Sequence, residues 1–585
     1  MKKITNIEIK KLEELYKLNK LNELEEKTKK LLEIEKKNSV LLNILGVVYL
    51  KKKLLNKAEL IFKEILDQHP HDINSLKNLG ETYRKLNKFR SAIDNYKLYL
   101  TFKPEDNEVI NNIASCYLKN KNYKLAINYY RDLIKKDPEN EEYLTNLAFA
   151  LIQSLNIESG LEILEKVLDK NINHNRAFSG YLQNQNFNPN INFDKLNNYV
   201  KKFNQSYKKN ILNIIDFKYE KYPKKINIGF ISPDFRAHPV GYCIKNIIKY
   251  LKLSSFNLYA YYNFNIEDDL TLEFKKNFNH FTNIVKFNNK EVIDKIRSDG
   301  IHILVDLAGH TINNNLDVFY YKAAPIQMSW LGSMNTTGIR EMDYKIIDEN
   351  IFLESMEKNY SEKLLKLPNI WTDYVVFQGD QVPLLVNQNE NEPVVFGSFV
   401  ALRKINDNVI NLWSKVLNKF QNTKIYFKAR ELKDELIKKN LKEKFFNHGI
   451  NAERLILEES SDHINYLKSY SKVHISLDPF PFNGVSTSFE SIWMGVPIFC
   501  LKGNSALSRC SYSINKNLKM EDWIAENEKD YLVKLEKILS DKKKLILIKK
   551  NLRERAINNN LFNSEKFTKS LSALFTQAWK NFSQV

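Results

Sequence analysis

The chain is poor in cysteine and has no long apolar run. Its four cysteines, Cys116, Cys243, Cys500 and Cys510, are scattered and form no C-x-x-C pair. This pattern argues against a zinc site or a disulfide framework and suits a reducing compartment. No apolar stretch approaches the roughly 18 residues of a membrane-spanning helix, and no apolar segment follows the N-terminal lysines as in a signal peptide. We therefore expect a cytoplasmic protein with no membrane partner.

The chain also lacks a G-x-G-x-x-G motif after any expected strand, which disfavours a dinucleotide-dependent oxidoreductase. Its charge is unbalanced: 89 lysines and arginines against 70 acidic residues give a net charge of +19. Such an excess suggests nucleic-acid binding, but the lysines are spread over the whole chain rather than gathered in one strip. We therefore expect no nucleic-acid partner, although the charge suits attraction of an acidic substrate.

The N-terminal third contains a repeat with a period of 34 residues. Tyrosines, two columns of small residues and prolines all recur at this spacing. The sets are Tyr49, Tyr83 and Tyr117; Gly46, Gly80, Ala114 and Ala148; Ala58, Ala92, Ala126 and Gly160; and Pro70, Pro104 and Pro138. Small residues recur where two helices approach closely, and proline ends a helix. The period is that of tetratricopeptide repeats, which stack into a superhelix, and residues 5–37 are expected to form an atypical terminal cap.

Three asparagines, Asn78, Asn112 and Asn146, recur with the same period. A side-chain amide both donates and accepts, so it can pair with a peptide backbone of any sequence. The concave surface of such an array binds extended peptides. We therefore predict that these asparagines bind a polypeptide. The alternative is that asparagine is simply abundant in this chain, and Ile44 interrupts the column in the first repeat.

From Lys225 onward, short β-rich runs alternate with helical segments, which implies parallel sheets. The expected strands are 226–231, 301–307, 394–399, 424–427, 454–457, 473–477 and 496–501. At 585 residues the chain is too long for one core, and the polar, proline-containing segment 378–393 divides two Rossmann-like halves. We assign residues 1–175 to the repeat array, 176–222 to a helical linker, and 223–385 and 386–585 to two α/β halves.

Polar motifs follow the ends of several expected strands. They read I-S-P-D-F-R-A-H-P-V-G from Ile231, D-L-A-G-H-T from Asp306, A-P-I-Q-M-S-W-L-G from Ala324, L-R-K-I-N from Leu402 and P-F-N-G-V-S-T-S-F-E from Pro481. Loops at the carboxyl ends of strands form the ligand crevice of an α/β sheet. Repeated placement of His, Lys, Asp and Thr there predicts a binding or catalytic site.

The order and spacing of these motifs resemble those of the O-GlcNAc transferase family of nucleotide-sugar glycosyltransferases, over roughly the last 360 residues. The resemblance implies two facing Rossmann-like halves, the GT-B architecture. It also implies inverting transfer of a sugar, with GlcNAc from UDP-GlcNAc the first choice, onto Ser or Thr of polypeptides. Many glycosyltransferases hold a metal with a D-x-D motif, which this chain lacks. We therefore expect no metal and no other cofactor, with protein donors stabilising the leaving diphosphate.

The resemblance assigns roles to residues of the second half. Lys404 aligns with the essential lysine of the family and would neutralise the leaving diphosphate. Ser486 and Thr487 open a helix after a glycine turn and would donate to the same diphosphate, because a helix N-terminus attracts anions. Glu490 would accept from the ribose hydroxyls, and His463 would contact the nucleotide. Asn483, Gly484 and Gln327 complete the predicted nucleotide-sugar site.

The acceptor hydroxyl must lose a proton as it attacks, so a base is needed. His238 matches a family histidine at the sugar and acceptor site, and histidine can take a proton near pH 7. Asp306 and His310 are alternatives at the end of a facing strand. The residues do not decide among the three, and the base could also be a group of the substrate.

Three positions depart from the family pattern and border the diphosphate and sugar. Ala401 stands where many members have a polar amide, Ser460 replaces a lysine, and Val485 replaces a histidine or threonine. These departures leave open another hexose donor or an asparagine acceptor, as in related adhesin-modifying enzymes. An inactive peptide-binding scaffold is a further alternative. The ordinary 34-residue repeat favours the Ser/Thr branch, and joint retention of Lys404 and the expected phosphate-binding turn disfavours an inactive relic.

Overall fold

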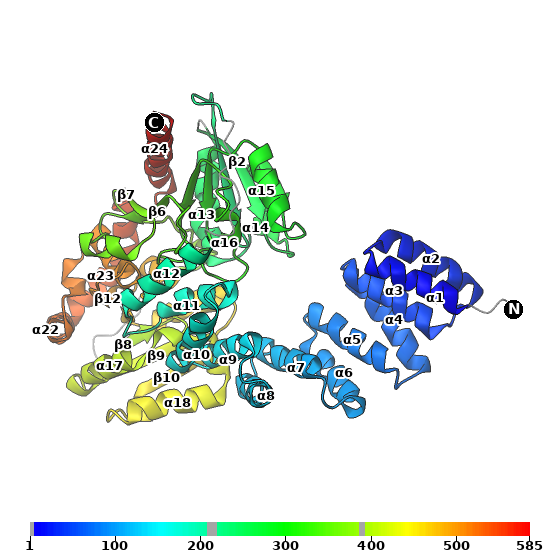
Figure 1. The fold of residues 1–585 in the computed structure, drawn as a ribbon. Coiled ribbons are helices and arrows are strands. Elements are labelled where there is room, and N and C mark those ends of the chain that lie inside the picture. The colour runs from blue at the N-terminus through cyan, green and yellow to red at the C-terminus, as the bar shows by residue number, and fades with distance from the viewer. Residues whose placement is uncertain (1–4, 208–218, 255, 385–391, 585) are drawn as a thin grey trace. The chain divides into compact units, whose positions relative to one another are not determined.

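The computed structural model describes residues 5–207, 219–254, 256–384 and 392–584. The chain divides into two compact units, Met1–Val167 and Leu168–Val585 (Figure 1). The repeat array predicted for residues 1–175 thus corresponds to the first unit, and the segment predicted as a linker lies in the second unit.

The first unit is a stack of helices in which each helix packs against the next. They are α1 (Asn6–Lys17), α2 (Leu21–Ile34), α3 (Ser39–Lys51), α4 (Leu55–Gln68), α5 (Ile73–Lys85), α6 (Phe89–Phe102), α7 (Asn107–Lys119), α8 (Tyr123–Lys136), α9 (Glu141–Gln153) and α10 (Ile157–Lys170), which continues into the second unit. The small residues recur for the predicted reason, which is that the two helices of a pair approach each other closely there. A Cβ at Gly46 would lie 2.6 Å from the ring of Phe62, and one at Gly80 would lie 2.6 Å from the ring of Tyr96.

The turns inside the helix pairs repeat with the same period. A residue with positive φ follows the first helix of each pair, at Asn19, Lys53, Asn87, Lys121 and Leu155, each 34 residues after the last. Because the series begins at Asn19, the pair α1–α2 has the same turn as the others. Residues 5–37 therefore form a complete helical hairpin, although they lack the sequence markers of the other repeats.

The second unit begins with α11 (Asn175–Gln185) and α12 (Phe193–Tyr207) and contains two parallel sheets. The first sheet has the order β3-β2-β1-β4-β5-β6-β7. Its strands are β1 (Ile226–Ser232), β2 (Phe256–Tyr262), β3 (His280–Asn283), β4 (Ile303–Asp306), β5 (Ile326–Ser329), β6 (Tyr344–Asp348) and β7 (Lys363–Leu367). Its helices are α13 (Pro239–Lys252), α14 (Asp269–Asn277), α15 (Asn289–Ser298) and the short α16 (Leu316–Phe319). Strand β4 is buried at every position, as expected of a central strand covered on both faces.

The second sheet has the order β10-β9-β8-β11-β12-β13. Its strands are β8 (Val394–Ser398), β9 (Thr423–Ala429), β10 (Leu455–Glu459), β11 (Ile475–Leu477), β12 (Ile498–Leu501) and β13 (Ile524–Ala525). The helices around it are α17 (Asp407–Lys419), α18 (Glu435–Phe446), α19 (His463–Lys468), α20 (Ser486–Trp493), α21 (Cys510–Asn517), α22 (Glu528–Leu539) and α23 (Lys542–Asn558). The expected fold class, two Rossmann-like halves after an all-α repeat array, is confirmed.

Both sheets share one topological property that positions the candidate site. In each, the chain starts at a central strand, builds one side, and then crosses to build the other. The order reverses between β1 and β4 in the first sheet and between β8 and β11 in the second. Ligands of open α/β sheets bind at such switch points, beyond the carboxyl ends of the strands. The loops after these four strands are therefore where a site is expected.

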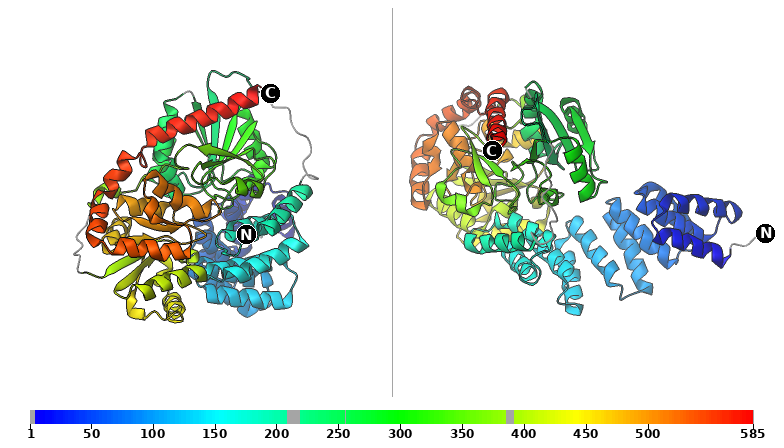
Figure 2. Two further views of the ribbon diagram at one scale, coloured as in Figure 1. Left: turned by 90° about the vertical axis from the view of Figure 1, so that its left-hand side faces the viewer. Right: turned by 45° about the horizontal axis from the view of Figure 1, so that its top comes forward.

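The position of the last helix, α24 (Ser564–Ser583), differs from the domain prediction, which placed residues 386–585 with the second half. It packs on α13 and on β5 and β7 of the first half (Figure 2). Asn246 of α13 donates to the Ser564 hydroxyl at 3.1 Å, and the ring of Trp579 meets His302 edge-on at 4.6 Å. The C-terminus thus returns to the first half and joins the two.

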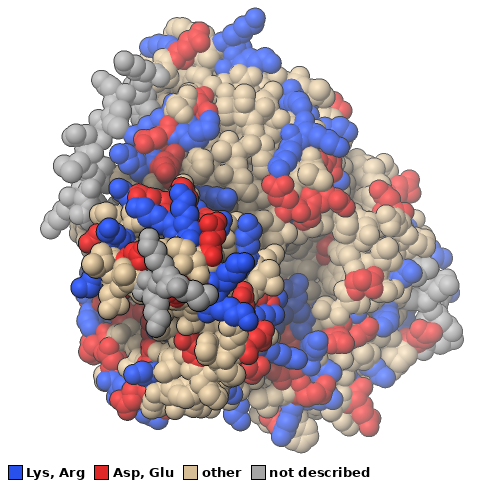
Figure 3. All heavy atoms as spheres, turned by 90° about the vertical axis from the view of Figure 1, so that its right-hand side faces the viewer, with Lys and Arg blue, Asp and Glu red and all other residues tan. Residues whose placement is uncertain are grey.

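The surface agrees with the dispersed charge seen in the sequence. On the face drawn in Figure 3, basic and acidic side chains are interspersed. All four cysteines are buried and unpaired. Among the helices of the described residues, none combines the length and apolar character needed to cross a membrane.

Candidate active site

A single peptide group joins two opposite charges at the switch point of the second sheet. Asp478 directly follows β11, and its Oδ1 accepts from the backbone N–H of Gly484 at 2.7 Å. Lys404, which lies just beyond β8, donates from Nζ to the carbonyl oxygen of Asn483 at 2.7 Å. The carbonyl and the N–H belong to the same Asn483–Gly484 peptide. This peptide therefore fixes the ammonium and the carboxylate relative to each other.

The pair is buried and only partly satisfied. Burial lowers the pKa of Lys404 and raises the pKa of Asp478, and each charge opposes the shift of the other. The ammonium also lies 3.7 Å above the ring of Phe482. Within the described residues, Oδ2 of Asp478 and the hydroxyl of Ser398 have no hydrogen-bond partner. Both side chains line one small cavity together with Thr487, so polar groups without partners face it.

Asp478 was not among the predicted site residues. An isolated acidic residue before a proline has no motif around it, and its position directly after a buried strand was the only available signal. Its importance depends on Gly484, six residues away, which only the folded turn brings to it.

Helix α20 begins without a side-chain cap. Its N-cap residue is Val485, whose side chain cannot accept a hydrogen bond, whereas α17, α18, α19 and α22 each begin with an Asn or Asp that accepts a first-turn N–H. Within the described residues, the backbone N–H groups of Ser486 and Thr487 have no acceptor. Uncapped N–H groups at the positive end of a helix bind anions. The N-terminus of α20 is thus open for an anion.

Glu490 lies one turn into α20 and is only 5% exposed. Its Oε1 accepts from the Tyr374 hydroxyl and its Oε2 from the Tyr466 hydroxyl, both at 3.0 Å. Burial raises its pKa to about 7, although the two phenols favour the charged form. Each carboxylate oxygen can still accept a second bond, so the predicted ribose contact would share Glu490 with the two tyrosines.

His463 begins α19, and its ring packs against Phe377 and Tyr466 with centroids 5.5 Å apart in each case. Burial lowers its pKa, which keeps the imidazole neutral near pH 7. Its Nε2 is buried and has no hydrogen-bond partner within the described residues. A neutral ring held between aromatic groups, with one nitrogen unpaired, fits the predicted contact with a nucleotide.

The segment predicted as a linker also reaches this site. Phe187, just after α11, packs against Phe482 with ring centroids 5.0 Å apart, and the Arg403 guanidinium lies 4.5 Å above the Phe187 ring. Phe482 in turn lies under Lys404. Residues after α11 therefore form part of the wall beside the buried lysine, which no sequence motif indicated.

In the first half, His238 caps helix α13 beyond β1. Its Nδ1 lies 3.3 Å from the N–H of Val240 and 3.3 Å from Oδ2 of Asp234. The two contacts require opposite tautomers. If Nδ1 accepts from Val240, the proton is on Nε2; if Nδ1 donates to Asp234, the Nε2 lone pair is free to accept a proton. Burial lowers the pKa of His238 to about 4 and raises that of Asp234 to about 6.

The two alternative bases, Asp306 and His310, are engaged in hydrogen bonds inside the fold. Asp306 accepts from the N–H groups of Ala308 and Gly309 and from the Ser329 hydroxyl, at 3.0, 2.9 and 3.1 Å. His310 uses both ring nitrogens. Nε2 donates to the carbonyl of Thr337 at 2.8 Å, so Nδ1 accepts from the Ser179 hydroxyl at 2.7 Å.

With no free nitrogen, His310 cannot take a proton without breaking a contact. The geometry therefore leaves His238 as the residue best placed to act as a base among the three predicted.

Two other predicted binding side chains are used inside the fold. The amide of Asn483 donates to the Pro479 carbonyl at 2.8 Å and accepts from the Ser511 N–H at 3.3 Å, so this residue contributes its backbone and not its side chain. The Gln327 amide is fully buried and bonds only to backbone groups, which are Ala323, Phe319 and Glu341. It fixes the chain around β5 rather than a ligand.

The periodic asparagines of the first unit take part in contacts between repeats. Asn78 donates to the side chain of Asn43 at 2.9 Å, and Asn146 donates to that of Asn111 at 3.2 Å. Asn146 is also buried. Two of the three predicted peptide-binding amides thus already connect neighbouring repeats, and any peptide contact would use their remaining capacity.

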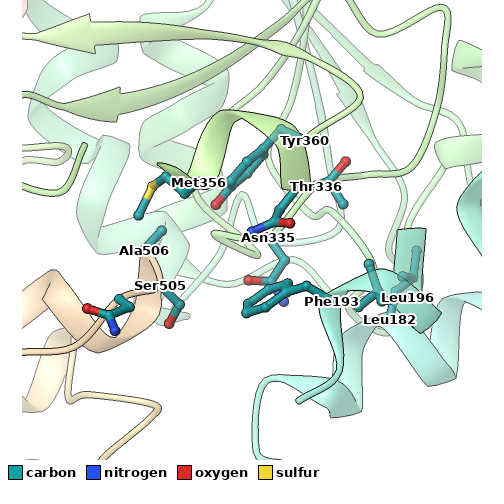
Figure 4. A pocket seen from close by; sticks show the side chains of 11 residues that line it. Leu182, Phe193, Leu196, Asn335, Thr336, Met356, Tyr360, Ser505 and Ala506 are labelled. Atoms are coloured by element: carbon teal, nitrogen blue, oxygen red, sulfur yellow. The ribbon is translucent and has the colours of Figure 1, made fainter. Parts of the chain in front are cut away.

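A further cavity lies between α11, α12 and the loops of both halves (Figure 4). Phe193 and Leu196 face Asn335, Met356 and Tyr360 across it. Its volume of about 20 Å³ is enough for roughly one water molecule. It is therefore a gap in the packing and not a site for a sugar. Among the described residues, no three His, Cys, Asp or Glu side chains are gathered in a way that could hold a metal.

Two parallel sheets with switch-point crevices carry a buried lysine and an open helix N-terminus, a set of groups suited to an anionic ligand. The chain belongs to glycosyl transferase family 41, whose model matches residues 197–391 and 386–571. A tetratricopeptide repeat model matches residues 117–179. The resemblance derived from the motifs is thereby confirmed at the level of the family.

Relatives of this chain have names that describe sugar transfer to peptides. The probable UDP-N-acetylglucosamine–peptide N-acetylglucosaminyltransferase SPINDLY of Solanum lycopersicum is 28% identical over 363 residues, which cover 61% of this chain and 39% of the relative. The probable UDP-N-acetylglucosamine–peptide N-acetylglucosaminyltransferase SEC of Arabidopsis thaliana is 22% identical over 366 residues, which cover 61% of this chain and 37% of the relative. The matched region is thus well under half of these relatives. A mutant O-GlcNAc transferase from Thermobaculum terrenum has the same fold, with a TM-score of 0.78 and 24% identity over 88% of this chain and 98% of that chain.

The buried pair leads to a prediction about the titration of Lys404. Its amine should react as a free base at lower pH than the exposed Lys442, because burial disfavours the ammonium. In Asp478→Asn the apparent pKa should fall further, by about one unit or more, because the charge that favours the ammonium is gone. The new amide oxygen can still accept from Gly484. Competitive acetylation over a range of pH, read by mass spectrometry, measures both residues in one sample.

Asp434→Asn is the matched control, since Asp434 is an exposed helix cap in the same half. It should leave the titration of Lys404 unchanged. If Lys404 titrated together with Lys442, or did not respond to Asp478→Asn, the two charges would not be in electrostatic contact.

Proposed function

We propose that this protein is an inverting glycosyltransferase that moves a sugar onto Ser or Thr of polypeptides, with GlcNAc from UDP-GlcNAc the first choice. The observation that carries the proposal is the uncapped N-terminus of α20 beside Lys404 at the switch point of the second sheet. A helix N-terminus and a lysine together suit a diphosphate. Family membership and the names of the relatives support the donor and the acceptor.

In this reaction the acceptor oxygen attacks the anomeric carbon while the bond from that carbon to the diphosphate breaks. Negative charge therefore grows on the diphosphate as it leaves. Lys404 and the N–H groups of Ser486 and Thr487 are the donors that would stabilise it. In the free protein the ammonium donates to the neutral carbonyl of Asn483. A diphosphate would offer it a charged acceptor, which makes a stronger hydrogen bond.

We assign the base to His238 in the tautomer that donates from Nδ1 to Asp234. In this tautomer Nε2 can take the proton of the acceptor hydroxyl, and Asp234 stabilises the imidazolium that forms. The lowered pKa keeps His238 neutral at pH 7, as a base must be before it accepts a proton. His238 lies at the switch point of the first sheet, in the half that faces the donor site in the GT-B architecture.

Of the predictions that follow from the proposed function, the first concerns turnover of a Lys404 variant. Lys404→Ala should lower turnover by about 10²–10³-fold, because it removes the charge that stabilises the leaving diphosphate. The assay offers a panel of UDP- and GDP-sugars and measures nucleotide release and sugar transfer by mass spectrometry, which also identifies the donor. Lys442→Ala, an exposed lysine on α18, is the control and should retain full turnover. Turnover near normal in Lys404→Ala would remove this lysine from the mechanism.

The second prediction concerns metal. The proposed stabilisation of the diphosphate uses protein donors alone, so excess EDTA should leave turnover essentially unchanged. The measurement compares rates with EDTA, without additive, and with added Mg²⁺ or Mn²⁺. A rate that disappears with EDTA and returns with Mn²⁺ would mean that a metal carries part of this charge.

The third prediction concerns the repeats, which we propose bind the polypeptide acceptor. Replacing Asn78, Asn112 and Asn146 by Ala should lower kcat/KM for long polypeptides, because amides that hold the backbone are lost. A short peptide that reaches only the catalytic half should be modified at the normal rate.

The matched control is Asn43→Ala with Asn111→Ala. It breaks the same bonds between repeats but leaves the three predicted amides in place. If this control reduced long-acceptor activity as much as the triple variant, the asparagines would act by packing the repeats and not by binding the acceptor.

A further inference from the structure

A larger cavity, separate from the two small ones described above, lies where the two α/β halves and the helices that connect them meet. It is lined by five segments: the turn after β6, the end of β7, the end of α21, the end of α23 and the start of α24. Its volume is about 500 Å³, which is within the usual range of small-molecule sites. None of the residues assigned to the nucleotide or the reaction lines it. It is therefore separate from the candidate active site.

The lining of this cavity is polar and positively charged. It contains Lys516, Lys519 and Lys566 and no aspartate or glutamate. Lys516 forms an ion pair with Glu521 at 3.0 Å, outside the lining. Within the part of the chain that the structure describes, Lys519 and Lys566 form no ion pair. The other polar residues of the lining are neutral: Asn350, Asn369, Asn517, Asn558, Asn559, Asn560 and Ser570. Within the described residues, such a lining supplies two positive charges without an ion-pair partner and no opposing carboxylate.

The helix ends at the cavity also affect the charge that a ligand would meet there. Helix α24 presents its first turn, which is the positive end of its dipole. Helix α21 presents its C-terminal end, whose carbonyl groups would repel an anion. Arg555 neutralises this end by donating to the carbonyls of Leu518 and Lys519 at 2.8 and 2.7 Å. Helix α23 also presents its C-terminal end, so the positive charge of the cavity comes from its lysine side chains.

The walls are also held rigidly across the two halves. The amides of Asn350 and Asn517, one from each half, both donate to the carbonyl of Asn369 at 2.9 Å. Arg509 donates to the carbonyl of Asn350 at 2.7 Å. A ligand in this cavity would thus meet rigid walls and would contact both halves at once, which lowers the entropy cost of binding.

From these observations we propose that the cavity binds a small anion with two or more phosphate groups, which bridges Lys519 and Lys566. One lysine follows α21 and the other lies in the first turn of α24, so two separate positive charges come from two elements. A single phosphate would leave most of the volume and one of the charges unused. The ligand class is a polyphosphorylated small molecule, and its binding would connect the halves at a place remote from the chemistry.

The test measures binding of inorganic tripolyphosphate to the full chain by calorimetry, with inorganic phosphate for comparison. Tripolyphosphate should bind more tightly than phosphate, with one site per chain that persists in Lys404→Ala. The double variant Lys519→Ala, Lys566→Ala should weaken it by about tenfold or more, since each charged hydrogen bond is lost. Lys439→Ala with Lys442→Ala, two exposed lysines of α18, is the charge-matched control and should bind normally.

Lys404→Ala distinguishes this cavity from the candidate active site, where a diphosphate is also proposed to bind. The proposal expects the tripolyphosphate affinity to survive Lys404→Ala. Loss of binding in Lys404→Ala but not in the Lys519, Lys566 double variant would place the probe at α20 and overturn the proposal. Equal weakening in the α18 control, equal affinity for phosphate, or no binding at millimolar tripolyphosphate would overturn it as well.

Discussion

The Asn483–Gly484 peptide is the group on which the candidate site depends. Lys404 holds its carbonyl and Asp478 holds its N–H, so the loops after β8 and β11 are joined through one rigid plane. A Cβ at Gly484 would lie 2.3 Å from the hydroxyl oxygen of Ser488 and 2.7 Å from that of Thr487, so a larger residue there would force both side chains to move. Helix α20 begins two residues later, and its open N–H groups are therefore fixed relative to the ammonium. Donors positioned before the reaction need no reorganisation when charge develops.

The fold was predictable where a pattern is local. All seven expected strands fall on strands of the structure, because each contains a short run rich in the aliphatic, β-branched or aromatic residues that favour strands. The strands that were missed carry other patterns. Strand β2 (Phe256–Tyr262) is built mainly from aromatic residues, and β5 (Ile326–Ser329) is four residues inside a motif whose polar residues suggested chemistry. The 34-residue period predicted the repeats because each unit meets its neighbour in the same way.

The site was predictable only in part, because a motif supplies residue types but not their partners. Asp306 and His310 were predicted from their place at a strand end, and Gln327 and Asn483 from the family resemblance. The fold occupies each of them with internal bonds. The Ser179 hydroxyl that engages His310 is 131 residues away in the chain, and no local pattern reports such a contact. Lys404, Ser486 and Thr487 do lie at a switch point, because strand order alone determines that position.

Hydrogen bonds between the two α/β halves also reach the part of the candidate site that is predicted to bind the nucleotide. Tyr374, which follows the first sheet, donates to Glu490 in the second half, and Ser513 of α21 donates to Asp348 at the end of β6 at 2.7 Å. Both acceptors are buried carboxylates, and leaving a buried acceptor without its donor is costly. Movement of one half against the other would break these bonds and disturb Glu490 directly. A change in the packing between the two halves would therefore move the carboxylate proposed to bind the ribose, although it involves no contact with the reacting atoms.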